Sequence, residues 1–309
     1  MSGWKRAEFE RLAMRTVLSV IYVFAFLVLG MANAHADMSL QSRLAKGQPF
    51  AVIAHRSAEI EGNPENSLAW IGAAIELGID MIHVNPQLTA DHHYVLMHDA
   101  TLNRMTNVEQ VFPIGPPNGP TRTARGGKDY VRDYTLEDIR RLSLRSLSGD
   151  DSHAVPTLQD AIETVDCRAI IVLGLKNCET ESLAAALATS KKDNLLLMEL
   201  YISGTDQSKL KETIAATGIG AMIVLYRSRD YLADLNKIEK QIGPEIRLVG
   251  SGSAGVTQEF LARLDELNIP LSISGWNGPE DRALTVKSDV AAWVEASRVA
   301  AAGSTDYPV

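Results

Sequence analysis

Residues 52–106 read VIAHRSAEIEGNPENSLAWIGAAIELGIDMIHVNPQLTADHHYVLMHDATLNRMT. The stretch contains two histidine segments, His55-Arg56 and His98-Asp99, and each follows a short apolar run typical of a β-strand. Between the two segments, residues 67–78 have the pattern of a helix that ends on glycine. Strand, helix and strand in this order predict parallel strands joined by a helix, with a histidine where a strand ends.

The alternation of strand and helix patterns continues to the C-terminal region and gives seven or eight units, which is typical of an α/β protein with a parallel sheet. No glycine-rich nucleotide-binding fingerprint follows a strand. The expected strands are residues 50–54, 81–88, 94–98, 169–176, 195–202, 221–226, 246–250 and 271–274, and the expected helices are residues 67–78, 157–165, 179–192, 207–217, 230–242 and 257–267.

One segment interrupts this rhythm. Residues 111–127 read VFPIGPPNGPTRTARGG, with four prolines and four glycines, and a segment this rich in breakers is a loop. We expect a loop at about residues 107–130, on the rim where barrel active sites lie. Arg122, Arg125 and Lys128 are then candidate anion contacts of a lid, and a plain surface excursion is the alternative.

The N-terminal residues have the features of a signal peptide. Four basic residues precede the apolar run 17–29, and Ala34-His35-Ala36 predicts cleavage before Asp37. The alternative is an uncleaved membrane anchor, although the run is short for a bilayer span of about 20 residues. We therefore expect a signal peptide at residues 1–36, a single domain at residues 37–309 and a periplasmic or secreted protein, which contacts a membrane only through the N-terminal segment if that segment is retained.

The net charge limits the classes of ligand that we expect, and the cysteine spacing argues against a disulfide. The chain has 309 residues and a formal charge of −8, which becomes −10 without residues 1–36. Nucleic-acid binders carry basic patches, so nucleic acid is not an expected partner, whereas a local basic pocket for a small anion remains compatible with this charge. The two cysteines, Cys167 and Cys178, flank an expected strand whose length separates them by more than a disulfide allows, and we expect free thiols.

The frame HR…PENSL…LTxDxxxVLMHDxTLxRMT resembles the glycerophosphodiester phosphodiesterases, a family of metal-dependent (β/α)8 TIM-barrel enzymes. The resemblance extends over residues 52–106, weakens towards Lys176 and is architectural beyond. It implies a (β/α)8 barrel. Residues 284–289 are the candidate for a shortened last family strand, which would make the last βα unit abbreviated.

The resemblance also implies roles for individual residues. His55 and His98 match the family's general base and acid, and Arg56 and Lys176 match its phosphate-binding residues. Glu65 matches a carboxylate of the same pocket, and Trp276 is the expected apolar wall for the alcohol moiety.

The family binds Ca²⁺ or Mg²⁺ through an E-x-D pair and an acidic residue two places before the lysine. Those positions are His83, Asn85 and Gly174 here. Because hard cations prefer several charged oxygen ligands, we expect no metal cofactor, although Zn²⁺ held by His83 and Glu65 is a weaker alternative. Ser57 also replaces a family glycine, and Pro86 lies inside the expected second barrel strand, which is unusual for proline.

Loss of three carboxylates beside Arg56 and Lys176 predicts an electropositive pocket. The expected function is recognition of a glycerophosphodiester or phosphate head group, with metal-dependent hydrolysis lost or altered. The alternative is an active glycerophosphodiester phosphodiesterase that uses the His55/His98 pair without the usual metal, with protonated His83 helping to replace the cation. A third interpretation is a wall- or membrane-associated interaction protein in which the pocket is vestigial.

Overall fold

In the computed structural model, eight parallel strands close into a barrel, and the described residues are 39–56, 60–146, 153–252, 255–274 and 290–305. Neighbouring strands follow the order β1-β10-β9-β8-β7-β6-β5-β2 around the barrel. This is the predicted TIM barrel. The barrel strands are β1 (Ala51–Ala54), β2 (Met81–Val84), β5 (Ile170–Gly174), β6 (Leu195–Leu200), β7 (Ala221–Val224), β8 (Ile246–Ser251), β9 (Leu271–Ser274) and β10 (Ala302–Thr305).

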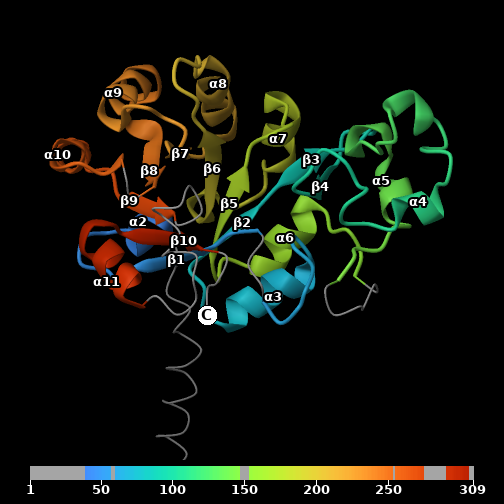
Figure 1. Cartoon of the computed structure of the whole chain (residues 1–309), viewed down its shortest axis with the longest axis horizontal. Helices are drawn as coiled ribbons and strands as arrows, with labels where there is room; N and C mark the ends of the chain where they lie inside the picture. The colour runs from blue at the N-terminus through green and yellow to red at the C-terminus, as the bar shows by residue number, and fades with distance from the viewer. Residues whose placement is uncertain (1–38, 57–59, 147–152, 253–254, 275–289, 306–309) are drawn as a thin grey trace, which may run out of the picture. The chain divides into compact units, whose positions relative to one another are not determined.

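Helices surround the barrel (Figure 1) and pack on the outward-facing residues of its strands. A short helix, α2 (Leu40–Arg43), precedes β1, and brief 3-10 turns precede β6 and β8. The surrounding helices are α3 (Leu68–Glu76), α6 (Leu158–Val165), α7 (Thr180–Ala186), α8 (Ser208–Thr217), α9 (Tyr231–Ile242), α10 (Gln258–Leu267) and α11 (Val290–Val299), and the two turns are η3 (Lys192–Asn194) and η4 (Gly243–Glu245).

Local capping explains why the predicted helices begin where they do. The hydroxyl of Ser67 accepts a hydrogen bond from Trp70 N at 3.0 Å at the start of α3. At the start of α6, Thr157 and Asp160 form a reciprocal capping box. Each bond satisfies backbone donors that the first turn leaves unpaired. The side chain of Trp70 is then fully buried in the core between barrel and helices.

Alternation along β2 sends its polar residues to the barrel interior. Ile82 and Val84 belong to the core between strands and helices, and successive strand residues point to opposite faces. His83 and Asn85 therefore point inward, and both are buried. On the next strand, Val172 pairs with His83, so Gly174 lies beside Asn85.

Residues 86–155, described here except for 147–152, form an insertion between β2 and α6 with a core of its own. The insertion starts with an antiparallel pair, β3 (Pro86–Leu88) and β4 (Tyr94–Leu96), and its core side chains include Met97, Phe112 and Tyr134. Four short helices follow: α4 (Val108–Val111), η1 (Thr123–Arg125), η2 (Val131–Asp133) and α5 (Leu136–Ile139). In Figure 1, α4 and α5 lie on the side of the barrel away from α9 and α10.

The insertion corrects three expectations. The expected strand 81–88 is two strands, and Pro86 begins β3 outside the barrel, where no barrel hydrogen bond is lost. The strand before His98 is likewise β4 of the pair and not a barrel strand. The predicted rim loop is a packed substructure in which Arg122 and Arg125 form ion pairs with Asp129 and Asp133, so these two arginines are not free for an anion.

The eighth strand, β10, was not anticipated from the sequence. It pairs with β1 and β9 and closes the barrel. The expected last strand at residues 284–289 lies outside the described residues, as do residues 1–36 and Trp276. Within the described ranges, no helix has the length and apolarity needed to cross a bilayer. Cys167 and Cys178 are free thiols, as expected.

Candidate active site

Three histidines lie at the C-terminal end of the barrel strands or close to it. His55 follows β1 directly, and its ring lies 5.3 Å from the ring of His83 on β2, measured between centroids. His98 reaches the same site from the insertion, two residues after β4. Its Nε2 lies 2.6 Å from Nζ of Lys176, which follows β5. The structure thus brings together residues that are more than a hundred positions apart in the sequence.

A chain of charged groups connects the two predicted phosphate-binding residues. Nη1 of Arg56 donates to Oε2 of Glu65 at 2.7 Å, and Nη2 of Arg104 donates to Oε1 of Glu65 at 2.6 Å. Nε of Arg104 also donates to Oδ2 of Asp99 at 2.6 Å. Asp99 in turn contacts His98, which leads to Lys176. Arg104 therefore joins the two histidine segments, a role that the sequence analysis did not assign.

Asp99 orients the imidazole of His98. Its Oδ1 lies 2.7 Å from Nδ1 of His98, and this contact turns Nε2 towards Lys176. Burial alone would raise the pKa of Asp99, but hydrogen bonds from Arg104 and His98 lower that pKa to about 2. Burial lowers the pKa of His98, and the bond to Asp99 only partly opposes this shift. At neutral pH, His98 is therefore a neutral ring whose Nε2 accepts a hydrogen bond from the Lys176 ammonium.

Lys176 differs from the other cations of the site because it has no carboxylate partner in the described part of the chain. Its Nζ contacts Nε2 and the backbone oxygen of His98. Burial, together with repulsion from Arg56, lowers the pKa of Lys176 to about 8. The side chain is still mainly charged at pH 7 and is available to a ligand anion.

Protein side chains fill the barrel interior beside the C-terminal ends of β2 and β5. Nδ2 of Asn85 lies 3.2 Å from Nε2 of His83, and Asn85 N donates to Oδ1 of Asn66 at 3.1 Å. A Cβ atom at Gly174 would come within 2.6 Å of Nε2 of His83 and would overlap Nδ2 of Asn85. His83 and Asn85 thus occupy space that only a glycine at position 174 leaves open.

These residues do not fit a divalent cation of the kind that the resemblance implies. Hard cations require charged oxygen ligands, and the positions in question offer an imidazole, an amide and a glycine. Both oxygens of Glu65 bind arginines, so in this structure Glu65 does not lie free beside His83 as a second ligand for Zn²⁺. No group of three metal-binding side chains occurs within the described ranges.

His83 itself is neutral. Burial, followed by repulsion from His55 and Lys176, holds the pKa of His83 well below its usual value. This lowered pKa disfavours the protonated form of His83 that the metal-free enzyme alternative invokes. The pocket is also less positive than expected, because Arg56 and Arg104 pair with the carboxylates of Glu65 and Asp99.

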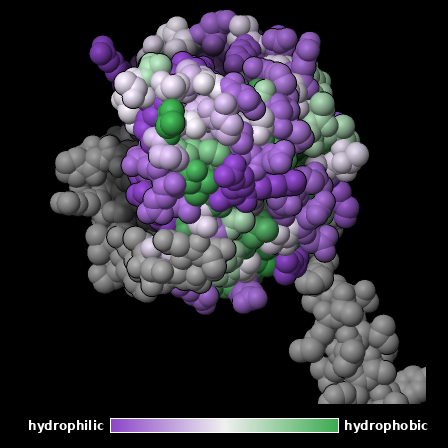
Figure 2. All heavy atoms as spheres, turned by 90° about the vertical axis from the view of Figure 1, so that its right-hand side faces the viewer, coloured by the Kyte–Doolittle hydropathy of each residue, from purple (hydrophilic) through white to green (hydrophobic). Residues whose placement is uncertain are grey.

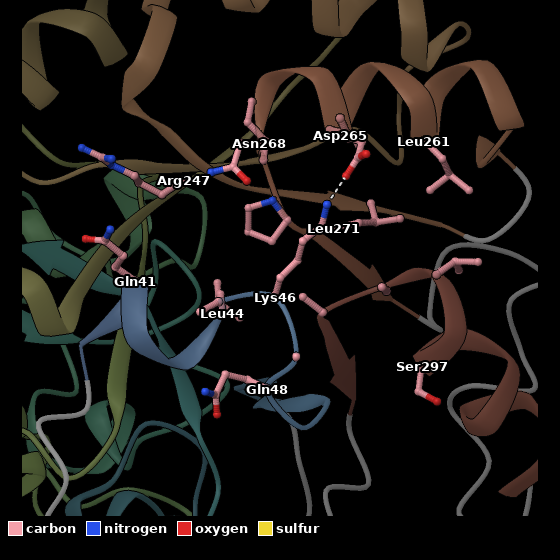
Figure 3. A pocket seen from close by; sticks show the side chains of 18 of the residues that line it. Gln41, Leu44, Lys46, Gln48, Arg247, Leu261, Asp265, Asn268, Leu271 and Ser297 are labelled. Atoms are coloured by element: carbon pink, nitrogen blue, oxygen red, sulfur yellow. Dashed lines mark hydrogen bonds and ion pairs between the residues drawn. The ribbon is translucent and has the colours of Figure 1, made fainter.

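A cavity of about 750 Å³ lies at the opposite end of the barrel, where strands begin. It is lined by α2, the segment before β1, the end of α10 and the residues before β10, and Figure 3 shows Lys46 and Asp265 paired across it. It contains none of the site histidines. Active sites of TIM barrels lie at the other end, where the strands finish.

The fold and the site together define a TIM-barrel protein with a cluster of histidines, cations and carboxylates at the C-terminal end of its strands. The model of the glycerophosphoryl diester phosphodiesterase family matches residues 55–209, half of the chain. The chain belongs to this family.

Curated relatives agree with this assignment. A glycerophosphodiester phosphodiesterase of Caldanaerobacter subterraneus subsp. tengcongensis is 33% identical over 123 residues, which are 39% of this chain and 42% of that protein. The uncharacterized protein YqiK of Bacillus subtilis is 26% identical over 245 residues, or 74% of this chain and 88% of YqiK. The chain spans less than half the length of the first of these relatives.

Solved structures share the fold. A glycerophosphoryl diester phosphodiesterase of Parabacteroides distasonis superposes with a TM-score of 0.63 at 19% identity, over 87% of this chain and 89% of that one. A phosphodiesterase of Oleispira antarctica, in complex with the product sn-glycerol-3-phosphate, gives a TM-score of 0.60 at 18% identity, over 84% and 94% of the two chains.

Proposed function

We propose that this chain binds the phosphoryl group of a glycerophosphodiester without a divalent cation, and that the family's metal-dependent hydrolysis is lost or altered. The packing of His83 and Asn85 against Gly174 carries this proposal. A Cβ atom at position 174 would lie 2.6 Å from Nε2 of His83 and would overlap Nδ2 of Asn85, so an acidic side chain there would require one or both of these side chains to move. The three replaced positions are therefore sterically coupled.

Two cationic groups of the site, Lys176 and Nε of Arg56, can each form a further interaction with an anion. Lys176 lacks a carboxylate partner among the described residues, and Nε of Arg56 is buried without a hydrogen-bond partner. Leaving a buried donor unpaired costs on the order of 1–3 kcal/mol. A phosphoryl oxygen would satisfy the Arg56 donor, and Lys176 would supply charge to the same group.

The ligand class rests on the family and on one relative. The Oleispira antarctica phosphodiesterase holds sn-glycerol-3-phosphate, its product. A phosphate ester of glycerol is therefore the first ligand to test here. We further propose an exported protein, on the strength of the basic and apolar pattern of residues 1–36; the size and cell fraction of the mature protein test this part.

Calorimetric titration with glycerophosphocholine in EDTA tests the binding function. We expect saturable heat with the wild-type protein, and a loss of about tenfold in affinity with Lys176→Gln because a charge-assisted hydrogen bond is removed. Lys211→Gln, an exposed lysine on α8, is the matched control and should bind normally. Absence of heat and of competition at millimolar ligand would refute the binding function. The remaining alternative would then be an interaction protein with a vestigial pocket.

A second candidate function, hydrolysis without a metal, is favoured by the pairing of His98 with Asp99. Neutral His98 fits the general base: its Nε2 takes the proton of the ligand's own glycerol hydroxyl while that oxygen bonds to phosphorus. His55 would then donate a proton to the departing alcohol as its P–O bond breaks. Because Lys176 Nζ occupies Nε2 in this structure, the base becomes available only when the phosphate draws the ammonium away.

Turnover separates the two functions. Release of choline from glycerophosphocholine in EDTA, abolished by His98→Ala and by His55→Ala, would establish the metal-free enzyme. Binding that persists without any release establishes a recognition protein.

A further inference from the structure

Part of the insertion, residues 100–146, carries a local excess of positive charge, whereas the insertion as a whole (residues 86–155) has eight basic and nine acidic residues. Residues 100–146 contain eight arginines and lysines but five aspartates and glutamates, whereas the whole chain has a formal charge of −8. Arg122 and Arg125 are neutralised by carboxylates, and Arg104 belongs to the active site. The remaining five cations are exposed and form no ion pair within the described ranges: Lys128, Arg132, Arg140, Arg141 and Arg145.

An apolar side chain projects from the same region. Ile114 is 73% exposed, more than any other large hydrophobic residue described. The turn that presents it is held firmly, because its backbone oxygen accepts from Arg122 N at 2.7 Å and the Arg122 guanidinium binds the oxygens of Phe112 and Pro113. These bonds hold the backbone of the turn in a conformation that leaves the Ile114 side chain exposed.

Arginines stack on aromatic rings close to this turn. The guanidinium of Arg141 lies 4.6 Å from the ring centre of Phe112, two residues before Ile114. Arg132 and Arg125 lie 5.6 and 5.7 Å from the ring of Tyr130. Figure 2 views this side of the molecule and shows hydrophilic side chains around smaller hydrophobic areas.

We propose that this surface of the insertion docks on an anionic phospholipid bilayer. Cations near such a bilayer gain from its negative surface potential, and a projecting isoleucine gains by entering the boundary between head groups and acyl chains. A bilayer accepts a single projecting apolar side chain without shape complementarity, whereas an acidic protein partner would need a matching pocket. His98 lies two residues after β4 of the same insertion.

Flotation with vesicles tests this surface. The full chain is mixed with vesicles of 30% phosphatidylglycerol and 70% phosphatidylcholine, or of phosphatidylcholine alone. We expect binding to the anionic vesicles, weakened by salt. Arg140→Glu with Arg141→Glu should lower the partition coefficient by at least about 25-fold, roughly fivefold for each cation removed, and Ile114→Asp by about tenfold.

The matched control is Lys211→Glu with Lys240→Glu, which changes the net charge equally on α8 and α9 and should bind as the wild type does. Residues 1–38 are the same in every variant, so their contribution cancels. Equal partition into both kinds of vesicle, or equal losses in the control, would overturn the proposal. Unchanged binding of Ile114→Asp would also overturn it, in favour of a polyanion bound by charge alone. Should the double arginine variant fail to fold, the Ile114 variant decides, because that side chain makes few contacts.

Discussion

The absence of a side chain at Gly174 leaves room in the barrel interior for the side chains of His83 and Asn85. With no side chain at this position, the imidazole of His83 and the amide of Asn85 lie side by side against the strand backbone. The residue that position 174 can accommodate therefore depends on the residues at positions 83 and 85. The nearby cations, Arg56 and Lys176, are the groups that we propose to bind the anion.

Gly174→Ala is expected to destabilise the protein by about 1–3 kcal/mol, because the added methyl group overpacks a filled space. The check is chemical denaturation of this variant alone and in the background of His83→Ala and Asn85→Ala. In that background the penalty should nearly vanish, since neighbouring substitutions are not additive. An equal penalty in both backgrounds would contradict the steric coupling.

The affinity for glycerophosphocholine should fall as the pH rises through about 8. An anion binds the protonated form of Lys176 more tightly, and its pKa of about 8 marks where the free protein loses that proton. A phosphodiester does not titrate in this range, so the effect belongs to the protein. Calorimetry between pH 6.5 and 9.5 measures it, and Lys176→Arg should show a flat profile because arginine stays charged. A sloping profile in the arginine variant would assign the effect to another group.

The sequence predicted some residues of the site and missed others. The motifs around His55 and His98, through the family resemblance, predicted that these histidines share a site with Arg56, Glu65 and Lys176. The bridge made by Arg104 was missed, although this residue lies inside the quoted motif, because its two partners come from different loops. The obstruction at Gly174 depends on the register of β2 against β5, which local patterns do not encode.

At the scale of elements, the insertion is the part that sequence patterns described least well. Its prolines and glycines predicted a loop, yet Asp129 organises it from within. This carboxylate, fully buried, accepts hydrogen bonds from Arg122 at 2.6 Å, Tyr134 at 2.6 Å and Asn103 at 2.8 Å. Burial and the bond to Asp129 raise the pKa of Tyr134. Polar groups spaced this far apart in the sequence leave no periodic signal.

Asp129→Asn should cost about 3–5 kcal/mol, because it leaves the largely buried Arg122 without its countercharge. Tyr134→Phe, which removes one neutral donor to the same carboxylate, should cost only about 1 kcal/mol. Hydrogen exchange should show lost protection across residues 100–140 in the Asn variant while β5 to β8 stay protected. Uniform loss over the whole chain would mean that the insertion does not unfold on its own.

At the scale of the whole molecule, the barrel was predictable and its closing strand was not. Capped helices and apolar strands, such as α6 and β5, gave clear signals. In contrast, β10 reads Ala302-Gly303-Ser304-Thr305, small and polar residues of which only threonine favours strands. Its place is set by pairing with β1 and β9 on either side.

Deletion of residues 300–309 should prevent stable folding, because it leaves unpaired backbone groups along both β1 and β9. Deletion of residues 306–309 alone, which keeps β10, is the control and should leave the melting temperature nearly unchanged. Circular dichroism melts compare the two. A cooperative transition in the longer deletion would show that the barrel does not depend on β10.

The most direct test of metal-free recognition is calorimetric titration of one sample with glycerophosphocholine, first in EDTA and then in millimolar Ca²⁺ or Mg²⁺. His83, Asn85 and Gly174 leave no ligand set for a hard cation, so we predict the same Kd in all three buffers and no heat from the cations alone. Binding that occurs only with a divalent cation would contradict the central claim.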